Sequence, residues 1–357
     1  MKVCLIIIIS IVMTGCSQNI QYTVHRNISE HYAYFNDIAV DSKNTIYLSY
    51  KDFAHNNRLS VMMYKNNTWE YAGHPAITPL DIYYSTMEMS KDDIPYIAYL
   101  DCKFEDRLSV IRYSHETWGN VGSPGISDGL VENISMSIDD EGRIYVAYSD
   151  KAHNYKLCVK VFNNERWDDV IKPGYFNGNF QSLSDSIRIV TGKNGGIHLL
   201  FIDSSDAYRL KYAVIKNGVV NLKTISEKSV TSIDMIYDAS NIYTVHSEED
   251  CNVLSEIRGS GEINKIVYNH GAPAFYNKLV MGKLNVPFIC MVNSTSLQLN
   301  VKSYYRGKIR SVYRASYKNT VSGMVSYMNV THDAEYTIYI AFRDHDFDNK
   351  AGLLIIK

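Results

Sequence analysis

The sequence carries no concentrated charge of either sign. Its 357 residues include 36 Lys and Arg and 38 Asp and Glu, which gives a net charge of −2, and no block of five like charges occurs. Binding to nucleic acids or to acidic membrane surfaces relies on a concentrated positive field. We therefore expect no nucleic acid among the partners and no polybasic contact with a membrane.

Recognisable catalytic motifs are also absent. The chain has no G-x-S-x-G, no H-E-x-x-H, no P-loop and no C-x-x-C. Each of these patterns holds reactive groups at the spacing that its chemistry requires. Their absence favours a protein that binds over an enzyme, and we expect no cofactor.

Long apolar runs are scarce. The N-terminal run Leu5–Met13 has nine residues, too few to span a bilayer but suited to the core of a signal peptide. Lys2 precedes this run, and the letters T-G-C follow it and end at Cys16. This order resembles the bacterial lipoprotein signal, which implies a signal peptide over residues 1–15 and lipidation of Cys16. The alternative is an ordinary secretory signal with a chance cysteine.

The same resemblance implies a location. A lipid on Cys16 would anchor the protein in a membrane on the extracytoplasmic side of the bacterial cell envelope. The next residue is Ser17 rather than Asp. By resemblance to enteric lipoproteins, nothing then holds the protein at the inner membrane, so we expect the outer membrane in a Gram-negative cell.

A short run that ends in a polar residue recurs seven times, about every 50 residues. The copies are IYLSYKD, PYIAYLD, IYVAYSD, IHLLFID, IYTVHSE, PFICMVN and IYIAFRD. Alternating apolar residues, many β-branched and aromatic side chains, and frequent turn signals indicate strands rather than helices. The sequence therefore predicts an all-β fold, a seven-bladed β-propeller with four-stranded blades.

Within one copy the four strands a to d can be read directly. In the second copy they are TMEMS, IPYIAYL, RLSVIRYS and TWGNVG. Strand b is apolar on both faces, as expected when blades stack on both sides of it. The propeller is expected over residues 32–357, with blades at about 32–80, 81–130, 131–180, 181–228, 229–274, 275–320 and 321–357.

The seventh copy has no strand d, because the chain ends after strand c. The segment NIQYTVHRNIS, residues 19–29, aligns with TWEYAGHPAIT, residues 68–78, which contains a strand d. We therefore expect residues 16–31 to hold the lipidated cysteine and the outer strand of the last blade. Closure by this strand removes the exposed edges of an open ring.

An acid at the end of strand b and a base at the start of strand c stand six positions apart in five copies. The b–c loop should bring them face to face, and such a cross-strand pair fixes the register of the hairpin. A ring of ligand sites is the functional alternative. The five pairs are Asp52 with Arg58, Asp101 with Arg107, Asp150 with Lys156, Asp203 with Arg209, and Asp344 with Lys350.

The full pattern is P-Y-x-A-Y-x-D, then a basic residue and an apolar strand, then W-x-x-V-G, with Trp69, Trp118 and Trp167 as the tryptophans. It resembles a repeat of bacterial secreted seven-bladed propellers. The resemblance covers residues 32–357, strongly in blades 1 to 3 and weakly in blades 4 to 6. That family is defined by its fold and has no shared activity, so the resemblance implies no function.

Histidines and cysteines give no metal pattern in the sequence. His55 and His153 occupy matching b–c loops of non-adjacent blades, so we interpret them as exposed loop residues. After the signal peptide and Cys16, four cysteines remain, in four different blades. We interpret them as isolated thiols rather than a disulfide, and we expect no metal. They are Cys102, Cys158, Cys251 and Cys290.

The side chains of strand a should line a central channel. The middle residues of these strands are Ala39, Glu88, Ser137, Arg188, Asp234, Lys278 and Asn329. One interpretation is that a wet channel simply has a polar lining. The other is a ligand pocket in which Glu88 and Asp234 serve as acid and base, since paired carboxylates cleave glycosidic bonds at defined separations.

Aromatic residues precede strand a in several copies, on the d–a loops. They should surround the channel mouth, where rings can stack on sugars, or they plug gaps between blades. We hypothesise a ligand site there, built from Tyr34, Tyr83, Tyr84, Tyr276 and Tyr327 above Glu88, Arg188 and Asp234.

Three functions are compatible with these sequence features. The first is a membrane-anchored module, expected to be a monomer, that binds a glycan or protein ligand without turnover. The second is a glycan-active enzyme, a hydrolase or lyase, that uses channel carboxylates. The third is a scaffold within an envelope complex.

Overall fold

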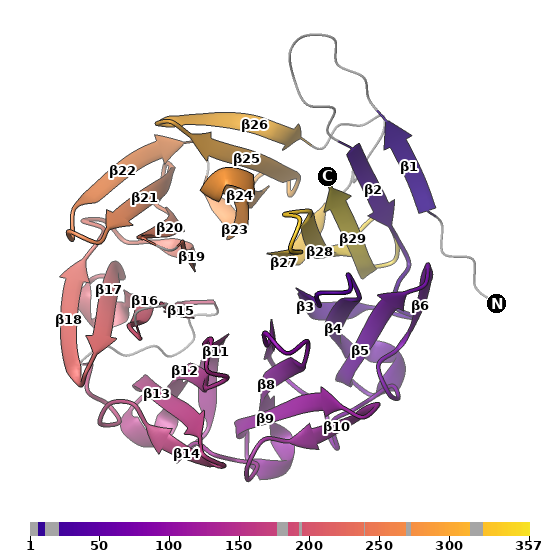
Figure 1. Cartoon of the computed structure of the whole chain (residues 1–357), viewed down its shortest axis with the longest axis horizontal. Helices are drawn as coiled ribbons and strands as arrows, with labels where there is room; N and C mark the ends of the chain where they lie inside the picture. Colours follow the sequence, from indigo (N-terminus) through magenta and orange to yellow (C-terminus); the bar gives the residue numbers. More distant parts are fainter. Residues whose placement is uncertain are drawn as a thin grey trace.

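The computed structural model describes residues 21–176, 185–192, 195–238, 240–268, 273–314 and 324–357, and only the backbone of residues 6–10. The chain forms seven antiparallel sheets arranged as blades around a central axis (Figure 1). This arrangement confirms the predicted seven-bladed propeller of four-stranded blades. No helix in the described part of the chain combines the length and the apolar character that crossing a membrane requires.

Each blade runs from an inner strand at the axis to an outer strand at the rim (Figure 1). The inner strands are β3 (Ala33–Val40), β7 (Ser85–Met89), β11 (Val131–Ile138), β15 (Ile187–Thr191), β19 (Thr231–Tyr237), β23 (Ala274–Gly282) and β27 (Val325–His332). The second strands are β4 (Ile46–Asp52), β8 (Pro95–Asp101), β12 (Ile144–Asp150), β16 (Ile197–Asp203), β20 (Asn241–Ser247), β24 (Val286–Asn293) and β28 (Ile338–Asp344).

The outer half of each blade completes the sheet. The third strands are β5 (Arg58–Lys65), β9 (Arg107–Ser114), β13 (Lys156–Asn163), β17 (Arg209–Lys216), β21 (Asn252–Arg258), β25 (Leu299–Tyr305) and β29 (Lys350–Ile356). The outer strands are β6 (Thr68–Tyr71), β10 (Thr117–Asn120), β14 (Arg166–Asp169), β18 (Val219–Thr224), β22 (Ile263–Tyr268) and β26 (Lys308–Arg314), with β2 (Gln21–His25) in blade 7. Short 3-10 turns are η1 (Phe53–His55), η2 (Cys102–Phe104), η3 (Lys151–His153), η4 (Ser204–Asp206) and η5 (Lys283–Asn285).

Blade 7 is closed by the two ends of the chain. Strand β2 pairs antiparallel with β29, with Tyr22 opposite Ile356 and Val24 opposite Leu354. A buried ion pair of 2.6 Å, from Nη1 of Arg26 to Oδ2 of Asp344, follows directly. The predicted closure by an N-terminal strand is thereby confirmed.

A further strand, β1 (Ile6–Ser10), pairs with the other edge of β2 and makes this sheet five-stranded. It comes from the segment that resembles a signal peptide. Cys16 lies outside the described residues, so its lipidation stays a prediction.

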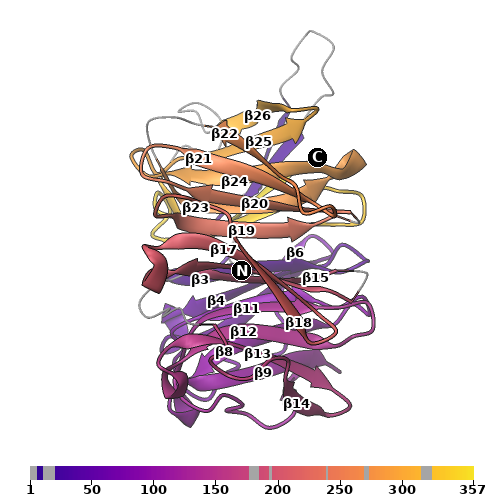
Figure 2. The same ribbon diagram turned by 90° about the vertical axis from the view of Figure 1, so that its left-hand side faces the viewer.

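The apolar core lies between the blades. Each second strand faces neighbours on both sides, and all seven residues of β8 and of β12 are buried. One cluster joins Leu157 and Val159 of blade 3 to Ile187, Ile189 and Leu199 of blade 4. Figure 2 shows the ring from its edge, with the outer strands β18 and β22 toward the viewer. Stacking on both faces explains why the second strand lacks the apolar–polar alternation of a sheet that has one face exposed to water.

The aspartate that ends the second strand caps the turn that follows it. Oδ1 of Asp52 accepts the N–H of Ala54 at 2.9 Å, and Oδ1 of Asp101 accepts the N–H of Lys103 at 3.1 Å. Short polar side chains commonly form such local turns with the backbone two residues ahead. The recurrence of this aspartate is therefore a matter of turn geometry.

The five predicted acid–base pairs occupy directly opposed positions on the second and third strands. Among the described residues, however, none of the five forms an ion pair. The carboxylate points into the turn that it caps. Two of the bases bind a carbonyl instead: Nε of Arg58 donates to that of His55 at 3.4 Å, and Nε of Arg209 to that of Asp206 at 3.3 Å. The register expected from these pairs is present, and its cause is the cap rather than the charge.

The tryptophans join neighbouring outer strands. Nε1 of Trp118 donates to the carbonyl of Ala72 in blade 1, and Nε1 of Trp167 donates to that of Val121 in blade 2, both at 2.8 Å. These bonds give the tryptophans the scaffold role assigned from the repeat. The four cysteines of the described residues are free thiols, Cys102, Cys158, Cys251 and Cys290.

Candidate functional site: the central cavity

A cavity of about 750 Å³ lies on the propeller axis, lined by all seven inner strands. Successive strand residues point to opposite faces, so every second residue of an inner strand faces this space. The seven residues that the sequence placed in the channel all belong to the lining: Ala39, Glu88, Ser137, Arg188, Asp234, Lys278 and Asn329.

These residues occupy two levels along the axis. The residues opposite the middle of each second strand form one polar ring of Asp37, Thr86, Ser135, Arg188, Asp234, Lys278 and Asn329. For blades 1 to 3 we predicted Ala39, Glu88 and Ser137 from the sequence. These residues lie on the same face of the strand, two positions beyond the ring residues of their blades. Alternation fixes which face a residue occupies but not its depth, so this offset was not visible in the sequence.

Several ring residues connect neighbouring blades. Oδ2 of Asp37 accepts the N–H of Met87 in blade 2 at 2.7 Å, and Oδ2 of Asp234 accepts the N–H of Leu279 in blade 6 at 2.7 Å. Both carboxylates thus satisfy buried backbone donors of the next inner strand. Burial raises the pKa of Asp37 to about 6, although the N–H groups of Met87 and Ile38 act in the opposite direction. These two acids have a structural task independent of any ligand.

A charged cluster lies at the d–a end of the cavity. The Arg188 guanidinium is 2.6 Å from Oδ1 of Asp185 and 2.8 Å from Oδ1 of Asp234. Nζ of Lys278 donates to Oδ2 of Asp185 at 3.1 Å, and the Tyr84 hydroxyl donates to Oδ1 at 3.2 Å. Burial alone would raise the pKa of Asp185, but the charges of Arg188 and Lys278 hold it well below its usual value. The cluster joins blades 2, 4, 5 and 6.

Asp185 was missed in the sequence because it precedes β15, outside the alternating part of the strand. The signal in the sequence was an acid just before an inner strand that carries an arginine. An arginine buried in a core needs such a partner.

Glu88 stands apart from these pairs. Its carboxyl lines the cavity, is half-buried, and has no hydrogen-bond or ion-pair partner among the described residues. Burial, with the negative charges of Asp37 and Asp234, raises the pKa of Glu88 to about 8. At neutral pH the group is therefore mostly protonated and can both donate and accept a hydrogen bond.

The predicted aromatic residues mostly meet at the d–a end. The Tyr327 ring lies 5.2 Å from that of Tyr34, 4.9 Å from that of Phe35 and 6.3 Å from that of Tyr276, between centroids. Phe35 also meets Tyr84 at 5.8 Å. These rings pack edge-on or tilted against one another, which is the arrangement of an aromatic plug.

Two further contacts define this aromatic end. The Arg343 guanidinium lies 4.1 Å from the centroid of the Tyr34 ring. Tyr83, in contrast, is 55% exposed, and its ring faces Nζ of Lys51 at 5.3 Å. The structure therefore does not bring Tyr83 into the cluster with the other four predicted aromatic residues.

The cavity opens at the opposite end, at the a–b turns between inner and second strands. Its lining extends to Ser42, Lys91 and Glu141 on these turns, all of which are exposed. Of the aromatic cluster, only Tyr84 lines the cavity among the described residues. A ligand would thus enter from the a–b face, not through the d–a mouth that the sequence favoured.

The loop histidines are not simply exposed. Nδ1 of His55 lies 2.9 Å from Oδ2 of Asp52, and Nε2 of His153 lies 2.7 Å from Oδ2 of Asp128. Their side chains are 28% and 29% exposed. Both help to hold a b–c corner, which corrects their interpretation as free loop residues.

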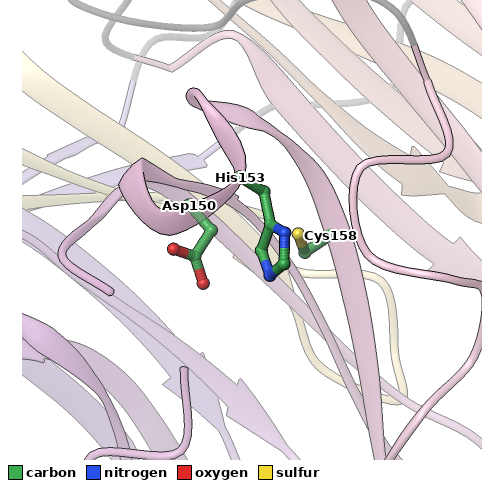
Figure 3. Close-up of side chains that lie close together, drawn as sticks. All are labelled: Asp150, His153 and Cys158. Atoms are coloured by element: carbon green, nitrogen blue, oxygen red, sulfur yellow. The ribbon is translucent and has the colours of Figure 1, made fainter. Parts of the chain in front are cut away.

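In blade 3 this corner also contains a thiol. Ligand-type atoms of Asp150, His153 and Cys158 lie within 4.8 Å of one another, and the three side chains lie close together (Figure 3). Asp150 caps its turn through the N–H of Ala152 at 2.8 Å. Burial raises the pKa of the Cys158 thiol to about 12. The thiol is thus protonated at neutral pH, as expected of a small packed side chain.

Comparison with known proteins identifies the fold only. No protein-family model matches the sequence, and no curated protein matches it. Hydrazine synthase of Kuenenia stuttgartiensis is similar in structure, with a TM-score of 0.60, 13% identity, and coverage of 91% of this chain and 96% of that chain.

Two other solved structures are similar at the same level. The lectin of Aleuria aurantia, in complex with Fucalpha1-6GlcNAc, has a TM-score of 0.52 and 10% identity, covering 79% of this chain and 95% of its own. A protein of unknown function from Dyadobacter fermentans has a TM-score of 0.51 and 11% identity, covering 91% and 94%. At such identities the likeness shows a shared β-propeller fold, and function has to be argued from the cavity.

Proposed function

We propose that this protein binds a neutral carbohydrate in its central cavity, without turnover. The observation that carries the proposal is Glu88, a carboxyl that has no partner in the described chain and lines a cavity of about 750 Å³. Polar groups facing a cavity are satisfied by a ligand or by water. The volume lies within the range of small-molecule sites, about 300–1,000 Å³.

The charge of the lining disfavours an anionic ligand. Asp37, Asp185 and Asp234 are opposed by Arg188 and Lys278, and Glu88 adds little negative charge at neutral pH because of its raised pKa. Toward the a–b turns the described lining adds Lys91 and six acids, namely Asp41, Asp93, Asp139, Asp140, Glu141 and Asp333. A neutral ligand avoids the repulsion that an anion would meet there. Sugar hydroxyls both donate and accept, which suits the carboxylates, ammonium and amide groups of the polar ring.

The likeness to a lectin supports the ligand class. The Aleuria aurantia lectin was solved with a fucose-containing disaccharide on a propeller of similar course. At 10% identity this raises the priority of sugars among neutral ligands and supplies no residue-level role.

The test is a glycan array probed with a form that lacks residues 1–16, followed by calorimetry on any positive sugar. Glu88→Leu should weaken binding at least about tenfold, because it leaves ligand hydroxyls unpaired. Glu88→Gln should keep most of the affinity at pH 7, since it preserves a neutral donor and acceptor. Tyr83→Ala is the control and should have no effect.

Two outcomes would contradict the proposal. One is binding that survives Glu88→Leu in a folded variant. The other is binding that Tyr83→Ala abolishes, since this would return the site to the outer aromatic face.

A glycan-active enzyme is the second candidate, because a carboxyl with a raised pKa is what a general acid requires. Glu88 would be the acid, and Asp234, the other acid considered from the sequence, is held by Arg188 at 2.8 Å. Release of reducing ends from an array-positive glycan, lost in Glu88→Gln while binding persists, would favour the enzyme.

We also propose that Cys16 carries a lipid that anchors the protein in the cell envelope. The support is the order of Lys2, the apolar run Leu5–Met13 and the following T-G-C. Expressed in a bacterium, the native chain should fractionate with membranes and Cys16→Ala should not. Equal membrane association of both chains would contradict a lipid anchor.

A further inference from the structure

The b–c corner of blade 5 lacks the cap that the other blades share. In the other six, an Asp or Asn side chain accepts the N–H two residues ahead, at Asp52, Asp101, Asp150, Asp203, Asn293 and Asp344. Blade 5 has Glu248 there, and no backbone N–H of the described residues donates to its carboxylate. The turn is short, with the N–H of Glu248 donating to the carbonyl of Cys251 at 2.8 Å.

Three metal-ligand side chains meet at this corner instead, and His246 lies beside one of them. Ligand atoms of Glu248, Asp250 and Cys251 all lie within 4.8 Å of one another. Sγ of Cys251 is 3.8 Å from Oε2 of Glu248, and Nε2 of His246 is 3.5 Å from Oε1 of the same residue. The sequence signal is the compact spacing H-x-E-x-D-C.

His246 supplies an independent observation. It is 1% exposed, and neither ring nitrogen has a hydrogen-bond partner in the described part of the chain. A buried polar group without a hydrogen bond is costly. Packing does not require a histidine here, because blades 4 and 7 place Phe201 and Phe342 at the same position. Nε2 of His246 instead faces Oε1 of Glu248 at 3.5 Å.

We propose that His246, Glu248, Asp250 and Cys251 form a zinc-type site that stabilises the blade 5 corner. Nitrogen, oxygen and sulfur ligands together are typical of Zn²⁺. A tetrahedron with bonds of about 2.0–2.3 Å separates neighbouring ligand atoms by about 3.3–3.8 Å. The 3.5 Å from Nε2 of His246 to Oε1 of Glu248 fits that geometry, and Sγ of Cys251 lies 3.8 Å from the other carboxylate oxygen, Oε2.

The charge of the ligands suits a cation. The carboxylates of Glu248 and Asp250 already attract Nζ of Lys228, at 3.7 and 3.4 Å. The side chain of Lys228 is 60% exposed, so a metal ion can displace its ammonium group into water. The side chain of Asp250 is 69% exposed, which leaves a path for the ion.

The corner in blade 3 provides the matched control. Asp150 there performs the same capping as Asp52 and Asp101, and Cys158 stands where blades 1 and 2 have Ser60 and Ser109. Every member is explained by the repeat, so Cys158→Ser should fold and leave any ion in blade 5 unaffected.

The test uses the chain lacking residues 1–16, reduced and stripped of metal. Zn²⁺ binding is measured by competition with a chromophoric chelator, and Co²⁺ is added to detect thiolate ligation by its near-ultraviolet charge-transfer band. The native chain should bind one ion and gain thermal stability. Cys251→Ser should remove the Co²⁺ band and weaken Zn²⁺ binding at least about tenfold, with a similar loss in His246→Phe.

Two sets of outcomes overturn the site. One is a native chain that binds no ion. The other is binding that Cys251→Ser leaves intact or that Cys158→Ser also abolishes. Circular dichroism and the melting temperature of each variant show that it is folded, and His246→Phe introduces the residue of blades 4 and 7. None of the four ligands lines the central cavity, so failure here leaves the carbohydrate proposal standing.

Discussion

Blades 1 to 3 and blades 4 to 6 share one architecture but use it differently. The first three repeat the same scaffold contacts, such as the tryptophan bond from Trp118 to Ala72 and the cap by Asp101. The second three have no tryptophan, and they place Arg188, Asp234 and Lys278 in the cavity. The regular half therefore shows what holding neighbours together requires. The residues by which blades 4 to 6 differ from this pattern show which positions are free to serve a function other than packing.

The largest loss of stability is expected in blade 7, where pairing of β2 with β29 closes the ring between the two halves. Removal of residues 17–30 takes away β2 and breaks the buried pair of Arg26 with Asp344. Breaking such a pair alone costs about 3–5 kcal/mol, a large part of a typical stability of about 5–15 kcal/mol. We expect a chain that fails to fold or melts far lower.

The control for this deletion is the chain that lacks only residues 1–16. It removes β1 but keeps β2, so its melting temperature should match that of the full chain. A chain that starts at residue 31 lacks β2. If its melting temperature equalled that of the full chain, closure by β2 would be contradicted.

The next effect contrasts a regular corner with the irregular one. Asp101 accepts bonds from the Tyr99 hydroxyl at 3.0 Å, the Ser109 hydroxyl at 2.8 Å and the N–H of Lys103 at 3.1 Å. Asp101→Ala leaves these donors unpaired and should cost about 3 kcal/mol in chemical denaturation. Glu248→Ala in metal-free protein should cost less than about 1 kcal/mol. Equal losses would show that blade 5 is capped like the others.

Glu88 is an exception within the regular blades, because its cavity-lining carboxyl has a raised pKa. The pH dependence of thermal stability should show this shift. Its folded pKa of about 8 lies above the ordinary value of 4.5, so the folded state binds the proton more tightly. This contribution to stability is fully present below about pH 4.5 and is lost as pH rises toward 8 and above. The melting temperature of the native chain should therefore fall more between pH 5 and 9 than that of Glu88→Gln. Parallel curves would contradict the raised pKa.

The smallest effect concerns a single outer contact. Trp118→Phe keeps most of the ring but loses the bond to the carbonyl of Ala72, at 2.8 Å. We expect a loss of about 1 kcal/mol in chemical denaturation. No change would mean that the regular blades are joined by apolar packing alone.

The fold was predictable because the sequence contains seven repeats with the period of a propeller blade. Seven copies of strand b, apolar on both faces, require stacked blades, and the missing last strand is supplied by β2, which lies within the segment aligned from the sequence. The register of the b–c hairpins followed from the Asp–base spacing. The mechanism did not, because an aspartate that caps a turn and one that pairs with arginine have the same sequence pattern.

The site was predictable in part. Alternation placed Arg188, Asp234 and Lys278 on the channel face, where the structure also has them. The sequence placed aromatic residues at the d–a end but left open whether they bind a ligand or plug the gap, since that depends on how residues of blades 1, 2, 6 and 7 meet. Asp185 escaped for a similar reason, since Lys278 and Tyr84, which also bind it, come from distant positions in the sequence.

The pairing of β2 with β29 also sets an order of events for the growing chain. Residues 21–25 are made early, whereas their partners at 353–356 are almost the last. At about 5–20 residues per second, roughly 15–70 s of synthesis separate the two strands. During that time the N-terminal strand has no sheet to join, so blades 1 to 6 can assemble while the seam stays open. The ring is thus sealed only when the whole chain is present, and a truncated product would carry two unpaired edges that quality control can recognise.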